Sequence, residues 1–133
     1  MDIRDIFRVG KVSSVNGANC TVRVTFPDKD DLVSDELAVI VPGSYNMKEY
    51  HLPRVKTQVL CCFLPNDSGR GMNAGFVIGG FYSVEDPPAD TDPEVYSLRM
   101  PDGCYFKFDG AGNLEIHATG NITITGANIF LNE

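Results

Sequence analysis

Two groups of residues carry side chains of the kinds that bind metal ions. The loop at residues 28–36 reads DKDDLVSDE and is rich in carboxylates, but Val33 and Val39 stand where a calcium loop needs its Gly and its bidentate Glu. The pair Cys61-Cys62 lacks the two-residue spacing of zinc and redox motifs, and neighbouring residues of one strand point to opposite faces. We therefore interpret the acidic loop as solvated and both cysteines as packing residues.

The remaining polar residues do not form a recognisable catalytic group. His51 is expected in a loop and His117 outward beside Glu115, and neither has a neighbouring Ser or Cys that would complete a triad. Glu115 and Glu133 are not the paired carboxylates of a glycosidase groove, and Gly69-Arg70-Gly71 lacks the strand-then-helix context of a phosphate loop. The sequence predicts no enzyme, no catalytic or metal-binding residues and no cofactor.

The composition narrows the classes of partner. The chain has 133 residues and a net charge of −7, and this acidity disfavours nucleic acid and anionic membranes, which attract basic patches. Neither a signal peptide nor an apolar run of membrane-spanning length is found, so we expect a product made soluble in the cytoplasm. The four cysteines are expected to be buried thiols and not disulfides: Cys20, Cys61, Cys62 and Cys104.

The positions with the clearest spacing lie at the C-terminus, where residues 112–133 read GNLEIHAT, GNITIT and GANIFLNE. Each unit opens with a Gly and an Asn, which suit a tight corner, and continues with apolar residues at alternate positions. That period is typical of a β-strand with one buried face. The buried positions predicted in this way are Leu114, Ile116, Ile122, Ile124, Ile129 and Leu131.

Three such short strands cannot close a core by themselves, because one sheet leaves its apolar face and its edges in water. The run is also too short for a single-chain solenoid, whose rungs are longer. We therefore predict that several chains interleave around a shared axis as a trimeric β-prism, with these six side chains forming the trimer core. The alternative is an ordinary C-terminal β-meander that packs on the preceding domain.

The N-terminal part contains five strand signals, at residues 9–15, 20–26, 36–41, 58–64 and 74–82. The first two are expected to form a hairpin through Asn16-Gly17-Ala18-Asn19. The third is a continuous apolar run that should be buried on both faces. One face of the second strand is expected to be core and carries Cys20, Val22, Val24 and Phe26.

The connections between these strands are rich in turn-forming residues. Residues 44–53 read as irregular, and the polar residues 65–69 read as a mobile loop tip. Gly75, Gly79 and Gly80 indicate a bulge or a close backbone approach in the fifth strand. Five antiparallel strands with glycine corners and no strong helix signal predict a small OB-like barrel.

A Pro-rich and acidic stretch, EDPPADTDPE, marks the division between domains. The predicted fold is all-β: an OB-fold barrel at residues 1–84, a linker at 85–94, and a trimeric β-helical needle at 95–133. The needle is expected to begin with short meander strands at residues 95–99 and 104–108, which lead through a turn into the C-terminal repeats.

Taken together, these segments resemble the baseplate assembly protein V family, the central spike of contractile phage tails. They are also similar to the spikes of type VI secretion and of R-type bacteriocins. The resemblance covers nearly the whole chain and rests on the order of motifs at residues 9–12, 22–27, 34–39, 52–67 and 75–80, followed by the repeats. It implies a homotrimer whose OB domain seats on the tail hub and whose needle meets the target envelope.

The chain departs from that family in two respects. It lacks the His-x-His motif with which some members hold an iron at the needle apex, and it carries no lysozyme domain between barrel and needle. The absence of an apical metal motif leads us to expect a separate small tip protein at the C-terminal end. The expected location is the virion tail baseplate, assembled in the host cytoplasm, or an equivalent contractile injection particle. The alternative function is an OB-fold module that binds single-stranded nucleic acid or oligosaccharide.

Overall fold

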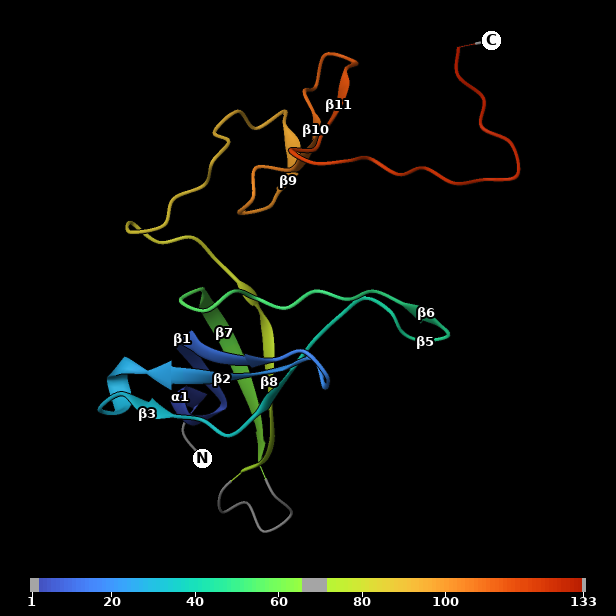
Figure 1. Ribbon diagram of the computed structural model, residues 1–133. Coiled ribbons are helices and arrows are strands. Elements are labelled where there is room, and N and C mark those ends of the chain that lie inside the picture. Colours follow the sequence, from blue (N-terminus) through green and yellow to red (C-terminus); the bar gives the residue numbers. More distant parts are fainter. Residues whose placement is uncertain (1–2, 66–71, 133) are drawn as a thin grey trace. The chain divides into compact units, whose positions relative to one another are not determined.

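The computed structural model describes residues 3–65 and 72–132, which belong to two compact units, Met1–Pro87 and Pro88–Glu133 (Figure 1). The first unit contains α1 (Ile3–Ile6), β1 (Phe7–Asn16), β2 (Thr21–Phe26), the 3-10 turn η1 (Pro27–Lys29), β3 (Leu32–Val33), β4 (Leu37–Val39), β5 (Ser44–Tyr45), β6 (Met47–Lys48), β7 (Gln58–Pro65) and β8 (Met72–Gly80). The second contains β9 (Tyr96–Arg99), β10 (Tyr105–Phe108) and β11 (Leu114–His117). None of the helices in the described part is long and apolar enough to cross a membrane.

Five strands of the first unit close into a barrel. β1 pairs antiparallel with both β2 and β7, and β7 pairs antiparallel with β8. β4 closes the circle, because it lies antiparallel to β2 and parallel to β8. The short β3 adds to β2. The described part of the chain is therefore all-β apart from the short helical turns α1 and η1, and the predicted five-stranded barrel is confirmed.

The barrel core is built from the inward positions of these strands: Val12, Val22, Val24, Phe26, Leu37, Val59, Cys61 and Val77. The predicted hairpin and the predicted alternation of β2 are confirmed, since Val22, Val24 and Phe26 are buried. Cys20 was wrongly assigned to this face. Cys20 precedes β2 and has a left-handed φ of 56°, because the chain is still turning there. Its side chain is only half-buried.

Other predictions for the barrel need correction. The third strand is only three residues long, and it is not buried on both faces, because Leu37 is buried while Ala38 and Val39 are half-buried. Ile40, which the predicted strand included, is 55% exposed. The segment predicted to be irregular contains the hairpin β5–β6. A bulge is confirmed beside Gly79, because Leu60 pairs with Gly79 while Cys61 pairs with Val77. The predicted loop tip at 65–69 and Gly69-Arg70-Gly71 lie almost entirely outside the described residues.

The second unit contains a three-stranded antiparallel sheet, here called the meander sheet, in the order β11-β10-β9. The strands expected at residues 95–99 and 104–108 are thus confirmed, and so is the first C-terminal repeat as β11. The second and third repeats do not form strands within one chain. Residues 118–132, here called the C-terminal extension, leave the sheet without pairing to any described strand (Figure 1).

Candidate functional site

One face of the meander sheet is apolar and uncovered within its unit. The pairing places Phe106 between Leu98 and Ile116, and Phe108 between Tyr96 and Leu114. Directly paired residues share one face of a sheet. The rings of Phe106 and Phe108 meet edge to face at 5.0 Å. All but Phe106 are exposed, so no described residue covers the large side chains of this apolar face: Tyr96, Leu98, Phe106, Phe108, Leu114 and Ile116.

The opposite face of the meander sheet is polar and is satisfied within the chain. Tyr105 lies between Arg99 and His117 in the pairing. The guanidinium of Arg99 sits 4.8 Å from the centre of the Tyr105 ring, and the His117 ring stacks on it at 5.0 Å. Tyr105 also donates a hydrogen bond to Glu115. His117 and Glu115 therefore share the polar face, as predicted, in a structural network.

Asp90 holds part of the predicted linker against this polar face. Its carboxylate accepts a hydrogen bond from Ser97 and two from Arg99, from Nε at 2.9 Å and from Nη2 at 3.0 Å. Bidentate pairing of this kind favours the ionised carboxylate. The bond from Arg99, followed by the bond from Ser97, lowers the pKa of Asp90 from 3.8 to about 2. Asp90 therefore anchors the chain ahead of β9 to Ser97 and Arg99 of that strand.

The contact between Asp90 and Arg99 should make the stability of the second unit depend on pH at low pH. Because the folded pKa of Asp90 lies below its unfolded value, the contribution of Asp90 to stability is full above pH 4 or so and is lost as the pH falls through about 2. We expect Arg99→Ala to return the pKa of Asp90 towards 3.8. An NMR titration of the side-chain carboxylates measures the pKa of Asp90 in both proteins. Asp109 is the internal control, because Asn113 and backbone amides lower its pKa, and it should not respond to the change at Arg99.

The backbone of the C-terminal extension lacks protein hydrogen-bond partners among the described residues, and its apolar side chains are exposed. Residues 120–132 make no hydrogen bond to any described residue. Five large apolar side chains of this segment are between 51% and 82% exposed: Ile122, Ile124, Ile129, Phe130 and Leu131. Within residues 3–65 and 72–132, the extension therefore has neither a partner strand nor an apolar cover.

The structure thus places the six predicted trimer-core residues in two settings. Leu114 and Ile116 lie on the apolar face, and the other four lie on the extension. Sequence reasoning missed the rest of the apolar face. Its signal was present in YSLR and YFKF, where apolar residues alternate in the same period of two. The missed residues are Tyr96, Leu98, Phe106 and Phe108.

The residues that could carry chemistry remain scattered. No group of three His, Cys, Asp or Glu side chains in the described part of the chain could hold a metal ion. Glu115 belongs to the polar network, whereas Glu133 lies outside the described residues. All four cysteines are free, but the expected burial is found only for Cys61, since Cys20, Cys62 and Cys104 are half-buried. Burial raises the pKa of the Cys61 thiol to about 11, which makes it a poor nucleophile.

Arg23 and Tyr50 are two barrel residues that a ligand-binding face could use, and both make contacts within the chain. Arg23 donates to the carbonyl oxygen of Ser34 at 3.2 Å and lies 3.9 Å from the carboxylate of Asp35. Tyr50 donates from its hydroxyl to the carbonyl oxygen of Gly17 at 3.1 Å. A nucleic-acid platform needs basic and aromatic side chains free to meet phosphates and bases. These contacts give no support to the alternative function.

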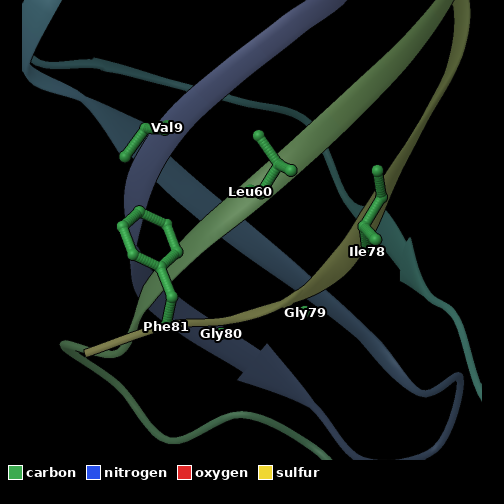
Figure 2. Close-up of a pocket in the computed structure, with 6 residues that line it drawn as sticks. All are labelled: Val9, Leu60, Ile78, Gly79, Gly80 and Phe81. Carbon is green, nitrogen blue, oxygen red and sulfur yellow. The ribbon is translucent and has the colours of Figure 1, made fainter.

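An apolar depression of about 390 Å³ lies on the outside of the barrel (Figure 2). It is here called the barrel depression, and it is lined by Val9, Leu60, Ile78, Gly79, Gly80 and Phe81. Val9 pairs with Leu60 and Leu60 with Gly79, so the lining runs across β1, β7 and β8. The lining contains no charged residue, which argues against catalysis and favours contact with another apolar surface.

Comparisons with known proteins add no relative to these observations. A scan against protein-family models finds none that matches the chain, and a search of curated proteins finds no match.

Proposed function

We propose that the protein is the structural central spike of a contractile tail baseplate and works as a homotrimer. In this proposal the barrel is an OB domain that seats on the tail hub, and residues 95–133 form a needle that contacts or pierces the target envelope. A small tip protein at the needle end remains a prediction. The particle is a virion tail or an equivalent contractile injection device.

The observation that carries the proposal is the combination of the apolar face with the C-terminal extension. The face exposes apolar side chains on three adjacent strands, and the extension exposes both apolar side chains and unpaired backbone. Uncovered strands of this kind pair with other chains. Copies of the chain supply both missing components, because an extension offers strand edges and each sheet offers an apolar surface. Assembly around a threefold axis satisfies all copies equally.

The barrel topology supports the OB assignment. Its strand order is that of a five-stranded Greek-key barrel, in which β4 and β8 form the single parallel pair among the barrel strands described. An OB barrel alone does not determine function, since the fold serves many. The resemblance to spike proteins and the uncovered second unit favour the structural role over ligand binding by the barrel.

Truncation tests the proposal. A chain that ends at residue 94 lacks the apolar face and the extension, so we expect it to be a folded monomer or a weakly associating barrel. The full chain is expected to be a trimer that survives dilution, because its subunit contacts lie mainly in residues 95–133. Size-exclusion chromatography with multi-angle light scattering gives both masses, and circular dichroism shows whether the truncated barrel is folded.

Two results would contradict the proposal in different ways. A truncated chain that stays a stable trimer on dilution would place the assembly contacts in the barrel. A full-length chain that is monomeric at every concentration tested would remove the trimer, and binding of an oligonucleotide or oligosaccharide by that monomer would favour the alternative function.

A further inference from the structure

The hairpin β5–β6, here called the finger, presents two large apolar side chains to solvent. Tyr45 is 85% exposed and Met47 is 77% exposed. They pair directly across the hairpin, so they lie on the same face of it. Tyr and Met are both enriched at the centres of protein interfaces. The finger therefore carries a compact apolar knob.

The finger is built to hold this shape. Glu49 donates from its backbone amide to the carbonyl oxygen of Gly43 at 2.9 Å, and Lys48 Nζ donates to the carbonyl oxygen of Ser44 at 3.3 Å. A side chain at Gly43 would lie 2.7 Å from the backbone oxygen of Met47, so the close approach of the two segments requires glycine there. A preformed element loses less conformational entropy when it binds.

The barrel depression is apolar, like the knob formed by Tyr45 and Met47. Val9, Ile78 and Phe81 around it are each a little under half exposed. Figure 2 shows these side chains and Leu60 standing around the floor formed by Gly79 and Gly80. Lys11, on the next outward position of β1, is paired with Glu85 at 3.2 Å. An apolar knob can enter without burying an unpaired charge.

A single chain cannot join these two surfaces. The finger and the barrel depression belong to the same unit. Figure 1 shows the finger projecting on the side of the β1–β2 turn, where Tyr50 bonds to Gly17, whereas the depression lies around Val9 near the start of β1. The knob of one copy can instead enter the depression of the next. Such a contact joins two different patches and is heterologous, so repeated contacts close into a ring when a rotation axis relates the copies.

The proposed trimer supplies the threefold axis that closes the ring. It also holds the three barrels close together, which raises their local concentration. Glu85 is held by Lys11 and Asp90 by Arg99, so the chain between barrel and meander sheet is tied down at both ends of a short segment. Short tethers raise the effective concentration of linked partners to about the millimolar range. A contact too weak to join free barrels then forms between barrels of one trimer.

We infer that, in the trimer of the proposed function, the finger of each chain inserts Tyr45 and Met47 into the barrel depression of the neighbouring chain. The three barrels thereby form a closed ring. This inference rests on the proposed trimer and assigns the partner of the depression as a second copy of this chain.

Cysteine cross-linking tests the contact in the full-length protein. The background carries Cys20→Ala, Cys62→Ala and Cys104→Ala, which remove the partly buried thiols and leave the buried Cys61. In this background Gly79→Cys is combined with either Tyr45→Cys or Met47→Cys. A side chain at Gly79 meets no atom within 4 Å, so this change leaves the barrel intact. After mild oxidation we expect covalent trimer as the main species on a non-reducing gel.

Matched variants separate this geometry from others. Lys48→Cys with Gly79→Cys places the thiol on the other face of the same finger and should give several-fold less covalent trimer. Gly79→Cys alone should stay monomeric on the gel, and covalent dimer from it would show that the depressions face each other, which overturns the inference. Absence of cross-links in a chain that light scattering shows to be trimeric also overturns it. A monomeric chain would instead reject the proposed function.

Discussion

Ile124→Asp is expected to abolish assembly of the full-length chain, and Ile122→Asp is expected to do the same. In the proposed trimer these positions face a dry axis, where three carboxylates meet and cannot all ionise. Burying a carboxyl group that has no hydrogen-bond partner costs roughly 2–7 kcal/mol, even when the group is neutral. Light scattering should report a monomer in place of a trimer.

Thr123→Asp is the matched control for these variants. The residue lies between the two isoleucines, so its side chain points to the opposite side of an extended segment. We expect it to leave the trimer mass unchanged. In a single chain Ile122 and Ile124 are 54% and 68% exposed, so an effect on the folding of one chain should be small. Equal loss of assembly from all three variants would contradict the register that we assign to the extension.

Gly10→Ala is expected to destabilise the barrel. A Cβ atom at this buried position would lie 2.5 Å from the backbone oxygen of Thr25 and 2.5 Å from a methyl group of Val24. Overpacking of this kind typically costs about 1–3 kcal/mol. For a domain of this size each kcal/mol lowers Tm by roughly 4–8 °C. Thermal unfolding followed by circular dichroism should therefore show a clear decrease in the barrel transition.

Gly79→Ala provides the comparison on the outside of the same barrel. Its Cβ would meet no atom within 4 Å, and its φ is not in the left-handed region. We expect its Tm to stay close to that of the unmodified protein. A decrease as large as that of Gly10→Ala would mean that loss of glycine, and not the collision with β2, determines the effect.

Local patterns predicted the strands well where each strand has a partner in the chain. The alternation of Val22, Val24 and Phe26 placed three core residues correctly, because side chains on a strand alternate whatever the strand pairs with. The same period in residues 114–117 predicted β11. Turn residues also marked the hairpin between β1 and β2, because glycine and asparagine adopt the conformations that tight turns require.

Long-range contacts determine how the barrel closes, which local patterns could not predict. The parallel pairing of β4 with β8 closes the barrel, and it joins segments separated by more than thirty residues of sequence. The finger was predicted to be irregular, because two strands of two residues are too short to show a period.

The residue pattern alone shows that Ile122, Ile124, Ile129 and Leu131 belong to segments with a strand period. Only the tertiary structure showed that Phe106 and Phe108 join Leu114 and Ile116 on one face, because that depends on the register between three strands. It also showed that the extension has no partner within the described part of its own chain. A periodic pattern specifies which side chains share a face, whereas hydrogen bonds to a neighbouring strand decide whether a strand forms.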